Sequence, residues 1–180
     1  MTTMKSIIYL TALLFATTSG ANAAGANDGH GHGDAATIGE LGSVADAARS
    51  VEIVLYDNYY EPESITVKKG ETVRFVIKNR GRLVHEFNIG TAEMHAAHKD
   101  EMLMMVKHGV LFPDRIDHEK MEAGGEDGHS MKHDDPNSVL LEPGKEGEIV
   151  WKFSEAAILE FACNIPGHYE AGMVGEFQWQ

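Results

Sequence analysis

From residue 51 onward, short apolar runs alternate with segments of turn-forming residues. The clearest run is residues 71–78, in which Val73, Phe75 and Ile77 alternate with polar side chains. Such alternation is typical of a strand with one buried face. The same criteria predict further strands at residues 51–56, 64–67, 83–89, 138–141, 148–153, 158–162 and 174–179. Several short strands joined by turns predict an all-β protein, either a sandwich or a barrel.

Residues 91–136 interrupt this strand pattern and form an insert. Its first half predicts a helix that Thr91 caps and Gly109 ends. One face of this helix collects the side chains of Met94, His98, Met102 and Met105. The second half, residues 119–135, is charged and is expected to be irregular. The insert holds six of the ten His and six of the nine Met residues, so its chemistry differs from that of the strands around it.

Residues 1–23 have the features of an export signal. Lys5 is the lone charge, an apolar core follows at residues 7–16, and Ala21-Asn22-Ala23 is a small-x-small cleavage site. The alternative is an N-terminal anchor helix, but this apolar core is shorter than the roughly 20 residues that span a bilayer. The sequence therefore predicts a protein exported to the periplasm and cleaved after Ala23.

Residues 24–50 are rich in Gly, Ala and Asp, and they predict a flexible leader before a domain at residues 51–180. The leader contains His30 and His32. These side chains either hold a metal ion loosely or belong to a solvated linker.

The formal net charge of −13 limits the partners of this chain. Nucleic acid requires a basic surface, and an anionic membrane repels an acidic one, so neither is expected as a partner. An acidic surface suits solubility, the capture of cations or attraction to a basic partner. We expect a monomer that does not insert into the membrane after cleavage.

Cys163 is the only cysteine of the chain. A single cysteine cannot form an internal disulfide, and a free thiol is reactive in an oxidising compartment unless it is buried or bound to metal. Export therefore favours a ligand role for Cys163.

Three metal-binding side chains follow one another at intervals of five residues: Cys163, His168 and Met173. Pro166-Gly167 turns the chain between the first two, and His85 supplies a second imidazole from far upstream. Each residue taken alone is more often found packed in a core. Together, two His, one Cys and one weak axial Met are the ligand set of a mononuclear blue copper site.

Residues 163–173, Cys-Asn-Ile-Pro-Gly-His-Tyr-Glu-Ala-Gly-Met, resemble the copper loop of the cupredoxins, the family of plastocyanin, azurin and auracyanin. Residues 61–75 are similar to the opening strands of that family, and Val84 and Phe87 flank His85 as the family pattern requires. The resemblance implies a Greek-key β-sandwich. It also implies that the type 1 copper ligands are His85, Cys163, His168 and Met173.

The sequence departs from the family pattern at two places. Many cupredoxins have Asn directly after the first His ligand, where it connects the two ligand loops, whereas this chain has Glu86. Simple electron carriers of the family also lack an insert rich in His and Met. In this respect the chain resembles the exported cupredoxins of bacterial copper tolerance, the CopI-like group.

These features favour a copper-tolerance protein that binds copper and cycles its oxidation state. Additional copper would bind weakly to secondary ligands in the insert and the leader. The candidates are Met94, His95, His98, Met102, Met104, Met105, His129, Met131, His133, His30 and His32. The alternative for the helix is an amphipathic element packed on the sandwich with Met as flexible filler.

Two other functions remain open. A soluble electron carrier would need only the type 1 site, and the insert would then dock a periplasmic redox partner or another copper-handling protein. A cuprous oxidase or reductase is less favoured, because multicopper enzymes use further His-x-His pairs and the chain has only His30 and His32. A single cysteine also excludes a dinuclear site with two bridging cysteines. We therefore expect a redox-active copper protein that is not a dedicated enzyme.

Overall fold

The computed structural model describes residues 38–123, 131–154 and 156–180. The described residues form ten β-strands. Their bounds are β1 (Glu40–Leu41), β2 (Arg49–Tyr56), β3 (Tyr59–Glu61), β4 (Ser64–Val67), β5 (Thr72–Asn79), β6 (His85–Gly90), β7 (Ser138–Leu141), β8 (Glu146–Lys152), β9 (Glu160–Ala162) and β10 (Val174–Trp179). The described residues also form the helices η1 (Val44–Asp46), α2 (Ala92–Lys107) and α3 (His118–Ala123).

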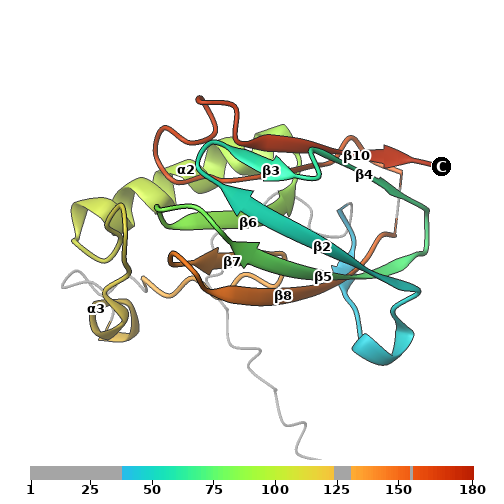
Figure 1. Cartoon of the computed structure of the whole chain (residues 1–180), viewed down its shortest axis with the longest axis horizontal. Helices are drawn as coiled ribbons and strands as arrows, with labels where there is room; N and C mark the ends of the chain where they lie inside the picture. The colour runs from blue at the N-terminus through green and yellow to red at the C-terminus, as the bar shows by residue number, and fades with distance from the viewer. Residues whose placement is uncertain (1–37, 124–130, 155) are drawn as a thin grey trace, which may run out of the picture. The chain divides into compact units, whose positions relative to one another are not determined.

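The strands form two five-stranded sheets, which pack as a sandwich (Figure 1). One sheet has the order β1-β8-β5-β2-β3, and the other has the order β4-β10-β9-β6-β7. β2 pairs with β5 and β4 with β10 in parallel, whereas all other pairs are antiparallel. Two packed sheets with mainly antiparallel pairs confirm the predicted all-β sandwich.

The core between the sheets is aromatic. The centroids of neighbouring rings are between 5.0 and 6.3 Å apart, within the range in which aromatic pairs attract each other. The rings belong to Tyr60, Phe75, Phe87, Phe153, Phe161 and Phe177. Since Phe87 lies on β6 and Phe161 on β9, this core fixes the two strands that lead to the predicted ligands His85 and Cys163.

The predicted strands largely agree with the structure. The predictions at residues 64–67, 138–141 and 174–179 coincide with β4, β7 and β10, and the others differ by a few residues at their ends. β3 was not predicted, because a three-residue strand after a tight turn shows no alternation of its own.

The prediction of a leader extending to residue 50 was wrong for its described part. Ile38 is buried, and its carbonyl accepts a 2.9 Å hydrogen bond from the indole of Trp151. Leu41 pairs with Trp151 as part of β1, and β2 begins at Arg49. The composition around β1 is typical of a linker, which is why the strand was not predicted. It forms by pairing with β8, which is far away in the sequence. His30 and His32 lie outside the described residues.

The insert follows the prediction in its first half. α2 begins after Thr91, whose hydroxyl accepts a hydrogen bond from the N–H of Met94 (3.3 Å), and Gly109 has a φ of 66° just beyond its end. α2 lies beside β6 (Figure 1). The second half is not wholly irregular, because Asp117 accepts hydrogen bonds that start α3, one of them from the N–H of Lys120 (3.0 Å). No helix among the described residues is long and apolar enough to cross a membrane.

Candidate metal centre

Three of the four predicted ligands lie at strand ends, and His168 lies in the loop between β9 and β10. His85 is the first residue of β6, Cys163 follows β9 directly, and Met173 precedes β10 directly. β6 and β9 are antiparallel neighbours, with Asn88 opposite Ala162, so His85 and Cys163 lie at the same end of the sheet. β9 and β10 are also paired, which returns the loop at residues 163–173 to this end.

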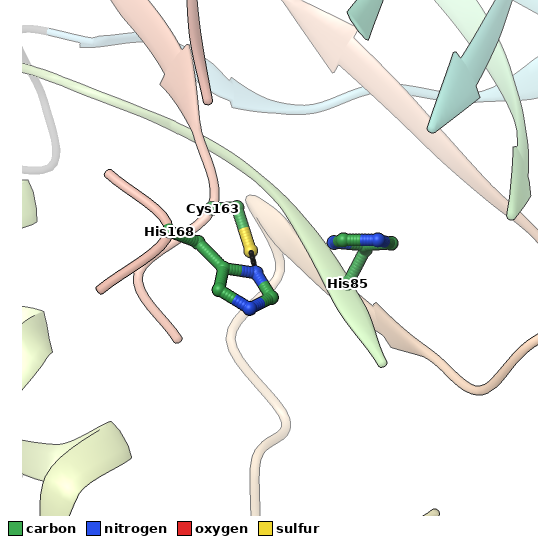
Figure 2. Close-up of side chains that lie close together, drawn as sticks. All are labelled: His85, Cys163 and His168. Carbon is green, nitrogen blue, oxygen red and sulfur yellow. Dashed lines mark hydrogen bonds between the residues drawn. The ribbon is translucent and has the colours of Figure 1, made fainter. Parts of the chain in front are cut away.

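Three of the ligands converge in space (Figure 2). One donor atom each of His85, Cys163 and His168 lies within 4.8 Å of the other two. The Sγ atom of Cys163 is 3.3 Å from Nδ1 of His168, and the two imidazole rings are 5.1 Å apart. His85 and Cys163 are fully buried, whereas His168 is only partly buried.

The loop holds its ligands through its own backbone. The N–H of Met173 donates to the carbonyl of His168 (3.0 Å), and the N–H of Cys163 donates to the carbonyl of Met173 (3.2 Å). Gly167 has a φ of 91°, which an L side chain rarely adopts, and it completes the turn that brings His168 back. Met173 is fully buried, and these two backbone hydrogen bonds hold it next to Cys163 and His168.

Asp57 orients the imidazole of His85. Nε2–H of His85 donates to Oδ1 of Asp57 (2.9 Å), and the same oxygen accepts the backbone N–H groups of Arg82 and Leu83. Nδ1 of His85 is buried and has no hydrogen-bond partner in the described structure. A carboxylate that fixes the tautomer and leaves the other nitrogen to the ion is typical of metal-binding His.

Sequence reasoning missed Asp57. Its only sequence signal is the pair Asp57-Asn58 between two Tyr residues, which is typical of a hairpin turn and says nothing about His85. The backbone of Gly81 passes so close that a Cβ atom there would collide with both the Asp57 carboxylate and the His85 ring. The pairing of Asp57 with His85 thus depends on contacts far apart in the sequence.

Burial sets the protonation of the three converging residues. It lowers the pKa of His85, and burial together with His85 lowers the pKa of His168 to about 4, so both imidazoles are neutral at pH 7. Burial and the nearby Glu86 carboxylate raise the pKa of the Cys163 thiol well above its ordinary value. An ion that binds the thiolate must therefore displace a proton.

The donor set fits copper. A thiolate, two neutral imidazoles and a buried thioether suit an ion that accepts both soft sulfur and nitrogen. Nδ1 of His85 is buried without a hydrogen-bond partner in the described structure, which is costly unless an ion binds it. His85, Cys163, His168 and Met173 are the residues that would hold the ion.

Glu86 connects the two ligand segments. Its carboxylate accepts hydrogen bonds from the backbone N–H (2.9 Å) and side-chain amide (3.0 Å) of Asn164, and its own N–H donates to Cys163 Sγ (3.3 Å). Burial opposes ionisation of Glu86, but His98 and His133 hold its pKa well below the usual range. Glu86 therefore takes the connecting role that Asn has in many cupredoxins, and it does so as a buried carboxylate.

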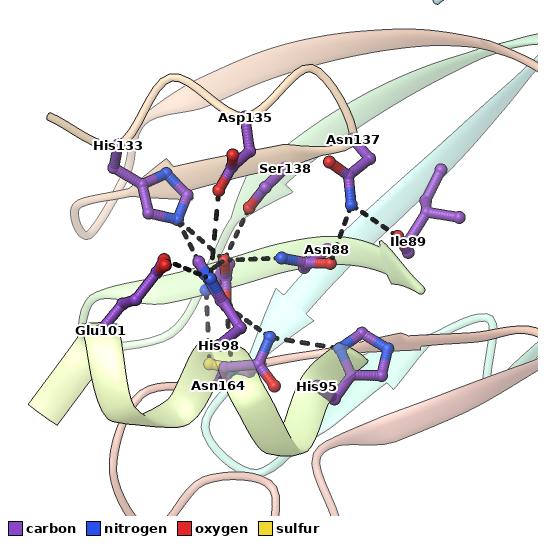
Figure 3. Close-up of polar contacts among 12 residues, drawn as sticks. Asn88, Ile89, His95, His98, Glu101, His133, Asp135, Asn137, Ser138 and Asn164 are labelled. Atoms are coloured by element: carbon purple, nitrogen blue, oxygen red, sulfur yellow. Dashed lines mark hydrogen bonds and ion pairs between the residues drawn. The ribbon is translucent and has the colours of Figure 1, made fainter. Parts of the chain in front are cut away.

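The structure brings only some of the predicted secondary ligands together (Figure 3). Nε2 of His98 lies 3.2 Å from Nε2 of His133, and His95 lies nearby, with Nδ1 accepting the amide of Asn164 (3.2 Å). Other predicted secondary ligands lie elsewhere. Met102, Met105 and Met131 belong to the hydrophobic core, Met94 packs against it, Met104 is 42% exposed, and His129 is outside the described residues.

The burial of Met102, Met105 and Met131 favours a role in core packing over a role in metal binding. Because α2 packs its methionines against the sandwich, the insert is part of the domain core.

The sandwich, with the candidate ligands Cys163, His85, His168 and Met173 at one end, defines the class of protein as a cupredoxin. A family model described as a cupredoxin-like domain matches residues 7–95. The copper-resistant cuproprotein CopI of Pseudomonas aeruginosa PAO1 is 55% identical over 155 residues, covering 83% of this chain and 84% of the relative. The CopI protein of Rubrivivax gelatinosus is 41% identical over 184 residues, covering 96% and 94%. The chain therefore belongs to the CopI family of cupredoxins.

Solved structures show the same fold at lower identity. Auracyanin B aligns with a TM-score of 0.56 and 18% identity, covering 79% of this chain and 96% of that protein. Dithionite-reduced auracyanin of Roseiflexus castenholzii aligns with a TM-score of 0.52 and 22% identity, covering 74% and 98%. Both alignments cover nearly the whole length of the auracyanin, so the likeness extends over its complete fold.

Proposed function

We propose that this chain is an exported copper-tolerance protein that binds copper at His85, Cys163, His168 and Met173 and changes its oxidation state. The observation that carries the proposal is the convergence of donor atoms of His85, Cys163 and His168 within 4.8 Å. The backbone of Met173 is hydrogen-bonded to two of these residues, Cys163 and His168. The names of the CopI relatives, which describe copper resistance, support the same function. Copper bound there would accept and release a single electron.

The residues of the site favour such a change of state. Two imidazoles suit Cu(II), and the two sulfur atoms suit Cu(I). The N–H of Cys163 donates to the carbonyl of Met173, Cys163 Sγ accepts a hydrogen bond from the N–H of Glu86, and His85 is fixed by Asp57. This fixed geometry needs little rearrangement when the charge of the ion changes. His168 is partly exposed and offers the edge through which an electron can enter.

The test is the colour of the copper protein. Copper-loaded wild type should show the intense visible band of thiolate-to-copper charge transfer, and Cys163→Ser should abolish it. His168→Ala should open a coordination position and change the band without removing the thiolate. A colourless wild-type copper complex would refute the type 1 assignment.

A soluble electron carrier is the second candidate, supported by the partly exposed His168. Deleting the insert would not separate the two functions, because Met102 and Met105 belong to the core and their loss would also change its packing. A cell-based comparison does separate them. In a strain lacking the gene, wild type should restore growth in excess copper, whereas Cys163→Ser should not. Equal tolerance of both strains would favour the carrier.

Export and the absence of a dedicated enzymatic activity are parts of the same proposal. Periplasmic protein should begin at Ala24, and a retained N-terminus would indicate an anchor instead. Oxidation of Cu(I) should stop at one equivalent per type 1 site, whereas continued turnover would identify a cuprous oxidase. Sedimentation should show a monomer.

A further inference from the structure

Glu86 also belongs to a second group of possible ligands, together with His98 and His133, which lie close to each other in Figure 3. Oε1 of Glu86 is 2.9 Å from Nε2 of His98 and 3.0 Å from Nε2 of His133, and the two nitrogen atoms are 3.2 Å apart. The three side chains come from β6, α2 and the segment before β7. All three are almost completely shielded from solvent, with exposed fractions of 0%, 4% and 5%.

The triangle has the dimensions of a metal site. Ligands bound at about 2.0–2.1 Å in tetrahedral geometry lie roughly 3.3–3.4 Å from one another. The three separations here are slightly shorter, as expected when N–H groups rather than an ion join the ligands. Both Nε2 atoms point at one oxygen, so a single ion between them would contact all three.

The orientation of His98 supports the same interpretation. Its Nδ1 atom pairs with Oε2 of Glu101 at 3.0 Å, which directs Nε2 towards Glu86. Asp57 does the same for His85 at the type 1 centre. A carboxylate behind an imidazole is the usual device for orienting a metal-binding His. Oδ2 of Asp135 adds further negative charge 4.0 Å from Nδ1 of His98.

We propose that Glu86, His98 and His133 form a second metal site, separate from the type 1 centre, which binds a divalent ion through two imidazole nitrogens and one carboxylate oxygen. Two nitrogens and an oxygen favour Cu(II) or Zn(II) over Cu(I), because the three ligands include no sulfur. The choice of Cu(II) rests on the proposed copper function, whereas the ligand set itself accepts zinc equally. Each imidazole would bind the ion through an unprotonated Nε2 and keep its one proton on Nδ1, which for His98 faces Oε2 of Glu101.

The two sites share Glu86. Its Oε1 atom faces His98 and His133, while Oε2 holds the backbone of Asn164 and its N–H donates to Cys163 Sγ. An ion bound to Oε1 would thus be connected to Cys163 Sγ through the Glu86 residue and the hydrogen bond of its N–H. Its positive charge should disfavour Cu(II) relative to Cu(I) at the type 1 centre.

Zinc is the probe for the second site, because it is colourless and does not change oxidation state. The mature chain is loaded with one equivalent of Cu(II), its visible band is recorded, and Zn(II) is then titrated by calorimetry. We expect one zinc ion per chain at this site with the band retained. His133→Ala and His98→Ala should each weaken this binding by more than about tenfold. Crystals of the zinc-loaded protein should show an anomalous scattering peak between Glu86 and His133.

His108→Ala is the matched control, because His108 is an exposed His at the end of the same helix. It should bind zinc as wild type does. A visible band in each variant shows that the domain has folded, and His133→Ala suffices if His98→Ala does not fold. Zinc binding of wild-type strength in His133→Ala would overturn the proposal, as would zinc that binds only by bleaching the band. If no band ever forms, the type 1 assignment fails, whereas the difference between wild type and His133→Ala still tests the second site.

Discussion

Glu86 accepts a 2.9 Å hydrogen bond from the backbone N–H of Asn164, so the residue after one ligand, His85, holds the residue after another, Cys163. Both side chains are fully buried. The hydroxyl of Ser138 also donates to Oε1 of Glu86 (2.6 Å), so each carboxylate oxygen of Glu86 has more than one donor. A buried charge with this many donors orders the ligand segments before any ion binds.

The first prediction concerns the charge of Glu86. Glu86→Gln should lower the free energy of unfolding of the metal-free protein by about 3 kcal/mol or more, because the amide NH₂ would face donors that need an acceptor. Chemical denaturation measures this loss. Glu148→Gln is the control, since Glu148 pairs with Arg74 on the surface and its replacement should change stability little. Equal stabilities of Glu86→Gln and wild type would show that the network is not required.

The second prediction concerns the residue that orients His85. Asp57→Ala should weaken copper binding by about 10- to 100-fold, because the imidazole loses the partner that fixes its tautomer. Competition with a chelator of known affinity measures the change. Asp114→Ala should have no effect, because Asp114 is exposed and pairs only with its neighbour Arg115 in the described structure. An unchanged affinity in Asp57→Ala would mean that the buried ring is oriented by packing alone.

The sequence indicated which candidate ligands lie together better than it indicated their surroundings. Cys163, His168 and Met173 stand in one loop, so their spacing alone predicts that they lie close to one another. Asp57 was not predicted, because it reaches His85 only through the pairing of β2 and β3 with the rest of the sheet.

The second group of ligands shows the same limit. His98 was predicted on a helix face rich in metal-binding residues, but Glu86 was noted only as a departure from the family pattern. The contact between His98 and Glu86 joins α2 to β6, and it cannot be predicted from the spacing of the two residues in the sequence. The methionines of α2 were predicted on one face, which the structure confirms for Met102 and Met105, but periodicity alone did not separate a core face from a metal-binding face.

The third prediction concerns the effect of pH on the pair of Glu86 and His98. Burial works against the charged form of His98, but Glu86 and Glu101 outweigh it and raise the pKa from 6.5 to about 10. Because the folded-state pKa is the higher one, the stabilisation is complete below about pH 6.5 and is lost as the pH rises towards 10. The difference in unfolding free energy between metal-free wild type and His98→Gln should therefore shrink between about pH 6 and about pH 9. A difference that stays constant would show that His98 is neutral in the folded protein.

The last prediction concerns the axial ligand. Met173 is fully buried, and Leu has nearly the same volume, so Met173→Leu should cost less than about 1.5 kcal/mol of stability. The thiolate and both imidazoles remain, so the copper protein should stay coloured. Loss of the weak thioether donor should disfavour Cu(II) and raise the reduction potential, which voltammetry measures. Met104→Leu is the control, because Met104 lies on the surface of α2 and should leave the potential unchanged. A potential that is unchanged or lower in Met173→Leu would show that this sulfur is not a ligand.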